Sequence, residues 1–202
     1  MKIKPMIFNS EMVEALLDGR KTVTRRPAKD MSFSENMGFQ VGKWCYGIGA
    51  TLKDTMNNCI SAKASKCPAR VGDLIYVRET FRLFDNSDEC GCSEFCGCPP
   101  TGTPIYFATH NDGDSKWKPS IHMPRWASRL TLKVTDVRIE KLNDLRKSDE
   151  QVKKEGFDSW PKFKHVWESI YGQSNPNDYV WVIEFEVIHQ NVDKYLEAIN
   201  GN

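Results

Sequence analysis

The stretch Gly19-Arg20-Lys21-Thr22-Val23-Thr24-Arg25-Arg26 decides how this chain is interpreted, and it follows directly on a short amphipathic segment. In that segment the apolar residues recur at helical spacing: Met12, Val13, Leu16 and Leu17. Gly19 stands where a helix commonly ends. The run that follows places a lysine three residues before a threonine, and the two can meet across one tight turn. Lys21 can therefore activate the Thr24 hydroxyl by lowering its pKa or taking its proton, or the same cations can bind a phosphate.

The composition bounds these alternatives. The chain has 202 residues with 40% hydrophobic and 11% aromatic residues, which excludes a wholly disordered protein and predicts one domain over residues 1–202. Its formal net charge is +1, so any binding of nucleic acid has to come from a local patch. Residues 20–29 hold five cations and no acid, which fits a phosphate-binding turn or a solvated basic face.

The sequence contains neither a leader-like apolar segment at its start nor an apolar run long enough to span a membrane. We therefore expect a cytoplasmic protein with no membrane partner. A reducing compartment disfavours disulfides, so the seven cysteines call for metal binding or burial. Four of them fall within nine residues: Cys90, Cys92, Cys96 and Cys98. Thiolates at this density favour a structural zinc site, with a redox-active thiol loop and incidental cysteines as the alternatives.

Two stretches are expected to be irregular inserts. Residues 30–69 are rich in glycine, serine, asparagine and lysine and show weak periodicity, and residues 85–104 contain the cysteine cluster. Between them, Leu74 to Val77 is typical of a buried strand, and it places Arg78 and Glu79 at a strand end, where they are either functional or a surface ion pair.

Residues 118–129 combine two prolines with cations and a tryptophan. His122, Arg125 and Trp126 are candidates for a platform that stacks a base and holds its phosphate. The alternative is that Met123 and Trp126 plug one end of the barrel while the arginines stay solvated, and His122 is a structural, hydrogen-bonded histidine.

The second half of the chain alternates strands and helices. Residues 130–139 predict one long strand with a bend, Ser148 opens a helix that Gly156 ends, and residues 179–188 form the clearest strand. Ser159 opens a second helix with a proline in its first turn, and Gly172 ends it. One face of this second helix is expected to be core: Phe163, Val166, Trp167 and Ile170. Glu155 then falls in the last turn of the first helix, where the helix dipole disfavours a carboxylate. A residue placed against local preference is a candidate for function, although a solvated surface glutamate is the alternative.

Four segments in order resemble the ASCH domain, a branch of the PUA-like superfamily of small β-barrels. They are the Gly-Arg-Lys-Thr-x-Thr-x-Arg run after a helix, residues 71–79, residues 150–157 and residues 179–185. Residues 118–129 resemble a longer subgroup that is common in phages and prophages. The resemblance implies an α+β fold, a small mixed β-barrel with flanking helices, which the two inserts interrupt.

The motif is similar to that of the 4-acetylcytidine amidohydrolase family within the ASCH proteins. The resemblance implies that Thr24 attacks the acetyl carbonyl, that Lys21 acts as base or stabilises the oxyanion, and that Glu155 orients the lysine and moves protons. No cofactor is implied for catalysis, and the partner is RNA or a modified nucleoside. The basic run, the strand end and residues 118–129 supply the candidate contacts to this ligand: Arg20, Arg25, Arg26, Arg78, Glu79, His122, Arg125 and Trp126. Because the family also includes RNA binders and a ribonuclease type, the alternative is a non-catalytic RNA-binding module or a ribonuclease.

Overall fold

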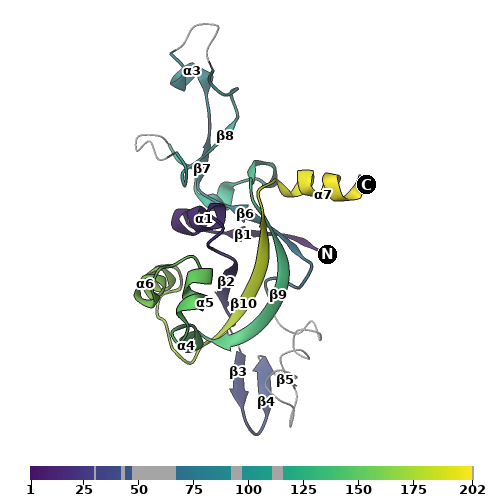
Figure 1. Ribbon diagram of the computed structural model, residues 1–202, viewed down its shortest axis with the longest axis vertical. Coiled ribbons are helices and arrows are strands. Elements are labelled where there is room, and N and C mark those ends of the chain that lie inside the picture. Colours follow the sequence, from purple (N-terminus) through teal and green to yellow (C-terminus); the bar gives the residue numbers. More distant parts are fainter. Residues whose placement is uncertain (30, 42–43, 47–66, 92–96, 111–115, 202) are drawn as a thin grey trace. The chain divides into compact units, whose positions relative to one another are not determined.

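The computed structural model describes residues 1–29, 31–41, 44–46, 67–91, 97–110 and 116–201. The chain is an α+β protein with a mostly antiparallel five-stranded sheet in the order β1-β6-β9-β10-β2 (Figure 1). These strands are β1 (Ile3–Ile7), β2 (Val23–Pro27), β6 (Leu74–Arg78), β9 (Thr131–Lys141) and β10 (Tyr179–Ile188). The helices are α1 (Ser10–Leu17), α3 (Asn86–Glu89), α4 (Leu142–Leu145), α5 (Asp149–Lys154), α6 (Trp160–Tyr171) and α7 (Val192–Asn200).

The sheet is open, and the expectation of a closed barrel is wrong. β1 pairs in parallel with β6, β6 pairs antiparallel with β9, and β10 pairs antiparallel with β2. Closure would need β1 and β2, the two ends of the strand order, to pair with each other. In the described part of the chain each of them lies at an edge of the five-stranded sheet.

The chain divides into two compact units, which are described separately. Unit 1 comprises residues 1–19, 74–133 and 187–202, and unit 2 comprises residues 20–73 and 134–186. That the whole chain is one domain stays a prediction.

Unit 1 contains α1, whose N-cap is Asn9; its side chain accepts a hydrogen bond from the Met12 amide at 2.9 Å. Ser10, whose residue type and position before the apolar stripe predict an N-cap, is instead the first residue of the helix. A two-stranded ribbon of β7 (Phe81–Leu83) and β8 (Pro104–Tyr106) packs on Met123 and Ala127. Two 3-10 turns, Ser120–His122 and Arg125–Ala127, precede β9. The insert at residues 85–104 begins with α3, and residues 92–96 lie outside the described residues.

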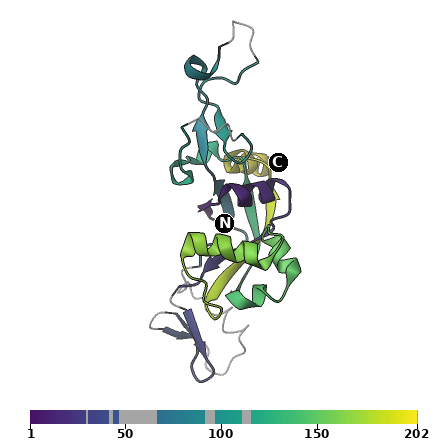
Figure 2. The ribbon, with the colours of Figure 1, turned by 90° about the vertical axis from the view of Figure 1, so that its left-hand side faces the viewer.

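Unit 2 places helices α4 to α6 beside β2 and β10, and Figure 2 shows α6 lying across this part of the sheet. Helix α6 begins after Ser159, carries a proline in its first turn and ends at Gly172, as expected. Phe163, Val166 and Trp167 form its buried face, whereas Ile170, expected on the same face, is 44% exposed. The Ser148 side chain caps α5, also as expected, by accepting from the Gln151 amide at 3.3 Å.

The insert at residues 30–69 is not irregular throughout, which corrects the expectation. Its first part forms a three-stranded antiparallel sheet of β3 (Met31–Ser34), β4 (Gly38–Val41) and β5 (Trp44–Tyr46). Gly38 opens β4 with a φ of +69°, a backbone conformation that glycine adopts without steric cost. Residues 47–66 lie outside the described residues. Within the described chain, no helix has the length and apolar character needed to cross a bilayer.

Candidate functional site

A buried ion pair joins Lys21 to Glu155 in unit 2. The Lys21 ammonium nitrogen Nζ lies 2.8 Å from Glu155 Oε2 and 2.8 Å from the Glu155 carbonyl oxygen. The two residues are 0% and 2% exposed. The sequence indicated both, and the structure brings them together although they are 134 positions apart.

Local backbone features explain this contact. Gly19 adopts a φ of +72° directly after α1, which lets the chain turn towards β2. Gly156, with a φ of +90°, ends α5 and leaves Glu155 as its C-cap. The Thr22 amide donates to the Lys154 carbonyl at 2.9 Å, and Lys21 and Glu155 form an isolated antiparallel bridge. Backbone hydrogen bonds therefore hold the lysine and the glutamate in register.

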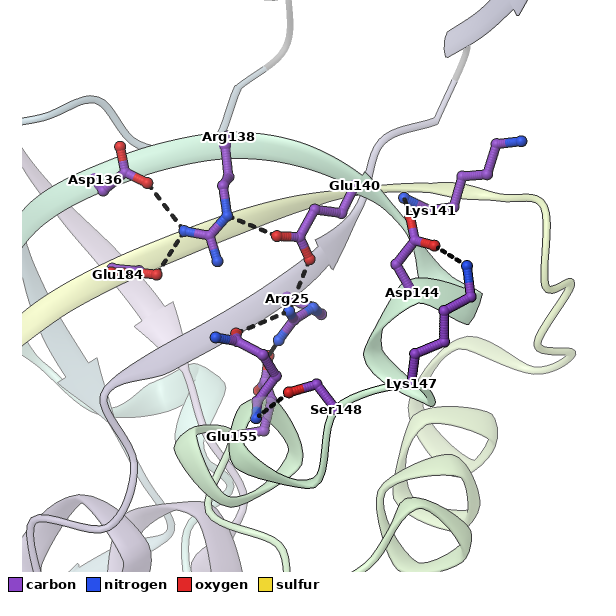
Figure 3. A network of polar contacts seen from close by, with 11 residues as sticks. Arg25, Asp136, Arg138, Glu140, Lys141, Asp144, Lys147, Ser148, Glu155 and Glu184 are labelled. Atoms are coloured by element: carbon purple, nitrogen blue, oxygen red, sulfur yellow. Dashed lines mark hydrogen bonds and ion pairs between the residues drawn. The ribbon is translucent and has the colours of Figure 1, made fainter. Parts of the chain in front are cut away.

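Arg25 binds the other oxygen of the same carboxylate, as Figure 3 shows. Its Nη1 donates to Glu155 Oε1 at 3.0 Å, and its Nη2 donates to Glu140 Oε2 at 2.8 Å and to Gln151 Oε1 at 3.3 Å. The guanidinium thus bridges the end of α5 to β9, which is the planar, forked geometry that arginine suits. Glu155 serves two cations, with one oxygen for each.

The network continues along β9 (Figure 3). Arg138 Nε donates to Glu140 at 2.6 Å, and its Nη1 donates to Asp136 at 3.0 Å and to Glu184 on β10. Three cations therefore meet four carboxylates in this part of unit 2. The ammonium group of Lys21 and the guanidinium of Arg25 are thus already engaged by carboxylates of this cluster.

The surroundings shift the pKa values of the cluster. Burial lowers the pKa of Lys21 below its usual value of 10.5, against the attraction of Glu155, and the charges of Arg26 and Arg25 act in the same direction as burial. Burial would raise the pKa of Glu140, but hydrogen bonds from Arg138 and Arg25 lower it below its ordinary value. Lys21 is thus easier to deprotonate than an exposed lysine, and Glu140 stays ionised.

Thr24, the expected nucleophile, is 2% exposed in β2 and lies opposite Ile183 of β10. Successive side chains of a strand leave opposite faces, so Thr24 and Arg25 point away from each other. The expectation that Lys21 meets Thr24 across a tight turn does not match this local structure, because residues 23–27 are a strand and not a turn.

The remaining cations of the basic run make their own contacts in unit 2. Arg20 Nη1 donates to the Gly156 carbonyl at 3.1 Å, and Arg26 Nη1 donates to the Tyr171 hydroxyl at 2.8 Å. Arg20 thus binds the backbone turn that follows Glu155, and Arg26 binds the last residue of α6.

The other candidate residues belong to unit 1. Arg78 Nε donates to the Met123 carbonyl at 2.8 Å, and its Nη2 donates to the Ile121 carbonyl. Glu79 is buried and accepts both Arg129 Nε at 2.9 Å and Arg129 Nη2 at 2.8 Å. Burial raises the pKa of Glu79, opposed by Arg129. The alternative reading of Arg78 and Glu79 as an ion pair with each other does not hold, because each has a different partner.

The two 3-10 turns of unit 1 carry the expected platform residues. Trp126 is 55% exposed and His122 is exposed, so Trp126 does not close the core. Met123, the other residue expected to be buried here, is fully buried in the core cluster of this unit. Arg125 donates to Asp193 at the start of α7, and the Arg129 guanidinium lies 4.1 Å from the centre of the Tyr106 ring.

The zinc prediction concerns four cysteines, of which Cys92 and Cys96 lie outside the described residues. Cys90 and Cys98 are both half-buried. Within the described residues no group of three or more histidine, cysteine, aspartate or glutamate side chains could hold a metal ion. The zinc site therefore stays a prediction.

Sequence reasoning missed the partners of Arg25 and the charges that extend the network. Asp136, Arg138 and Glu140 recur at every second position of β9, which is the signature of one polar strand face. That spacing is visible in the sequence and could have indicated a charged face. The contact between Arg25 and Glu140 spans 115 positions, and no local pattern signals it.

Comparison with known proteins gave no match to any family model, to any curated protein or to any solved structure.

Proposed function

We propose that this protein is an ASCH-type enzyme that acts on RNA or a modified nucleoside and hydrolyses the amide of an acylated cytidine such as 4-acetylcytidine. The observation that carries the proposal is the buried contact between Lys21 and Glu155, two of the three residues that the resemblance implies as catalytic. The PUA-like fold is part of the same proposal.

The environment of Lys21 suits general base chemistry. Burial lowers its pKa, so the neutral amine that can accept a proton is more accessible than in an exposed lysine. The Glu155 carboxylate fixes the position of the amine and is the nearest acceptor for a proton that Lys21 takes up. Arg25, which holds the second oxygen of that carboxylate, keeps Glu155 in place.

In the proposed reaction the Thr24 hydroxyl adds to the acyl carbonyl carbon and transfers its proton to Lys21. The bond from that carbon to the cytosine amino nitrogen then breaks, and the nitrogen leaves with the proton as cytidine. Water hydrolyses the resulting threonine ester and regenerates the hydroxyl. This requires the Thr24 hydroxyl and Lys21 Nζ to approach each other when substrate binds.

The same cluster argues against the phosphate-binding alternative at this position. Lys21 and Arg25 already bind carboxylates, and both are buried. A phosphate there would have to displace Glu155 or Glu140 from these cations, which would leave a buried or half-buried carboxylate without its partner. The geometry therefore favours acid–base chemistry over a phosphate clamp.

The test is hydrolysis of 4-acetylcytidine by the purified chain, followed by chromatography. We expect cytidine to be released, Lys21→Met and Glu155→Gln to abolish the release, and Lys153→Met, an exposed lysine on the same helix as Glu155, to leave it unchanged. Thr24→Val separates the roles: loss of turnover with retained affinity identifies the nucleophile. If the folded protein releases no cytidine, the amidohydrolase proposal is wrong.

A second candidate, a non-catalytic RNA-binding module, is favoured by one observation in unit 1. Trp126 is 55% exposed in the 3-10 turn that follows Pro124, beside Arg125 in sequence. An exposed aromatic ring next to a guanidinium is a stacking site for an unpaired base. Binding of single-stranded RNA that weakens steeply with salt, in a protein without hydrolase activity, would favour this candidate.

A further inference from the structure

A pocket of about 430 Å³ lies in unit 2 where the end of β2, the end of α6 and the start of β10 come together. Three aromatic residues, Trp167, Tyr171 and Tyr179, line it together with Pro27, Ala28 and Val180. This volume falls within the range of small-molecule sites. None of the proposed catalytic residues is among its lining residues, so it is a separate feature of the unit.

The aromatic wall of this pocket is held in place by contacts within unit 2. The Tyr171 hydroxyl accepts a hydrogen bond from Arg26 Nη1 at 2.8 Å. The rings of Trp167 and Tyr171 lie 4.6 Å apart at 53°, and Trp167 is only 6% exposed. The Ala28 amide donates to the Tyr179 carbonyl at 2.9 Å, which joins two sides of the pocket. A wall formed in this way binds a ring with little loss of side-chain entropy.

The polar residues of the pocket differ in charge and in hydrogen-bonding capacity. Lys29 supplies a positive charge, Asp178 a carboxylate, and Gln173 both a donor and an acceptor. Burial raises the pKa of Tyr179, and the negative charge of Asp144 raises it further. The Tyr179 hydroxyl therefore keeps its proton at neutral pH and can donate it in a hydrogen bond.

This combination excludes several kinds of ligand. A purely apolar ligand would bury Lys29 and Asp178 without partners. A simple inorganic anion would leave the aromatic wall unused. A methylated ammonium group suits aromatic rings with a carboxylate, but the charges of Lys29 and Arg26 at this pocket oppose it. A planar ring with donors and acceptors on its edge, attached to a negative group, uses all of these residues.

We propose that this pocket binds a nucleotide, with its base against Tyr171, the edge of the base towards Gln173 and Asp178, and its phosphate at Lys29. A carboxylate and an amide are groups that read the amino and carbonyl edge of a base. The same chemistry is offered by a free mononucleotide and by one unit of a single-stranded RNA. The proposal does not depend on hydrolysis at Lys21.

The test is calorimetric titration of the full chain with cytidine 5′-monophosphate, with cytidine, and with a short single-stranded RNA at low salt. We expect Tyr171→Leu to weaken binding of the monophosphate about 5-fold to 100-fold, the range of a lost stacking contact. Tyr171→Phe keeps the ring and loses only the hydrogen bond from Arg26, so it should weaken binding less than Tyr171→Leu. Lys29→Ala should weaken the monophosphate more than cytidine, and the matched control Lys153→Ala should change neither.

The outcomes separate the possible ligands. Equal affinity for the monophosphate and the RNA identifies a free nucleotide as the ligand, and tighter binding of the RNA identifies a strand. If Tyr171→Leu lowers the stability of unit 2, Gln173→Ala replaces it in the comparison of affinities with the wild type, because Gln173 is at an exposed position. The proposal is wrong if the folded chain binds none of the three probes, if Tyr171→Leu and Gln173→Ala bind them unchanged, or if the pocket binds tetramethylammonium in place of them. Lys21→Met should retain binding, which distinguishes failure here from failure of the hydrolase proposal.

Discussion

Lys21 Nζ lies 2.8 Å from Glu155 Oε2, and both side chains are buried. Glu155 also binds Arg25 through its other oxygen, so one carboxylate compensates two buried cations. The two cations are not equivalent in this respect, because Arg25 has Glu140 as a second partner. Among these ion pairs Lys21 has Glu155 alone, and this asymmetry has measurable consequences.

Removing the carboxylate should destabilise the protein more than removing the lysine. Glu155→Ala leaves Lys21 buried without its carboxylate, and breaking a buried pair in this way costs about 3–5 kcal/mol. Lys21→Met replaces the cation with an apolar chain of similar length and leaves Glu155 bound to Arg25, so the loss should be smaller. Urea denaturation measures both free energies of unfolding, with Lys153→Ala as the control. If Lys21→Met lowered the free energy of unfolding as much as Glu155→Ala or more, the proposed dependence of Lys21 on Glu155 would be contradicted.

The lowered pKa of Lys21 should make stability depend on pH. Between its folded pKa and the unfolded value of 10.5, the unfolded chain binds more protons than the folded chain, so the free energy of unfolding rises with pH in that window. One proton gives a slope of at most about 1.4 kcal/mol per pH unit. Lys21→Met removes this contribution. The free energy of unfolding of the wild type should therefore increase relative to that of the variant as pH rises.

The measurement is denaturation of both proteins at several pH values from neutral to about 10. Subtracting the variant from the wild type cancels the groups common to both, including Tyr106 and Tyr179, whose raised pKa values act at similar pH. Two curves that stay parallel over this range would show that Lys21 titrates at the same pH in the folded and unfolded chain.

Local patterns in the sequence predicted the helices and strands that hold the site. The cap at Ser148, the apolar face of α6 and the long strand at residues 179–188 are all decided by residues close in sequence, and the structure confirms them. The position of Glu155 at the end of α5 follows from Gly156, which is why the sequence could indicate it.

Long-range pairings could not be predicted in the same way. The open edge of the sheet depends on which distant strands pair, and the hydrophobic pattern of a strand does not encode its neighbour. Likewise, the strands of residues 31–46 are short and carry few β-branched residues, so their composition resembled a loop. The Arg25 and Glu140 contact belongs to the same class, because it depends on tertiary structure alone.

Trp126→Ala should affect binding and not folding. Its side chain is more than half exposed, so the change should cost less than about 1 kcal/mol of unfolding free energy. If Trp126 stacks a base, the affinity for single-stranded RNA should fall about 5-fold to 100-fold. Fluorescence anisotropy with a labelled RNA measures this, and Ile121→Ala, another exposed apolar residue of the same region, is the control. Unchanged RNA affinity would remove Trp126 from the proposed surface.

The four-cysteine segment of residues 90–98 should bind one zinc ion per chain if the sequence expectation is right. Metal analysis of the purified protein should then give a ratio near one, and a double Cys92→Ser and Cys96→Ser variant should give a ratio near zero. Because catalysis is assigned to residues of unit 2, removal of the metal by a chelator should leave hydrolysis unchanged. A metal-free wild type with reactive thiols would instead favour the redox loop.

The contribution of Glu79 to stability in unit 1 should depend on pH with a sign opposite to that of Lys21. Glu79 is paired there with Arg129. Burial raises the pKa of Glu79, so between the usual value of 4.5 and its folded pKa the folded chain binds more protons, and this contribution to stability is lost as pH rises. Arg129 opposes the shift through two hydrogen bonds. Arg129→Met should therefore destabilise the protein more at neutral pH, where the buried Glu79 has lost its compensating charge, than near pH 4, below the folded pKa of Glu79.

Denaturation of Arg129→Met at both pH values tests this, and the double variant with Glu79→Gln supplies the control. Because a neutral amide at position 79 has no charge to compensate, the double variant should recover stability at neutral pH relative to Arg129→Met and lose the pH dependence. The Arg129 guanidinium also lies over the Tyr106 ring, and this packing is lost in both variants, so it cancels in the comparison. A loss that is the same at both pH values would assign the role of Arg129 to packing on Tyr106 and not to the charge of Glu79.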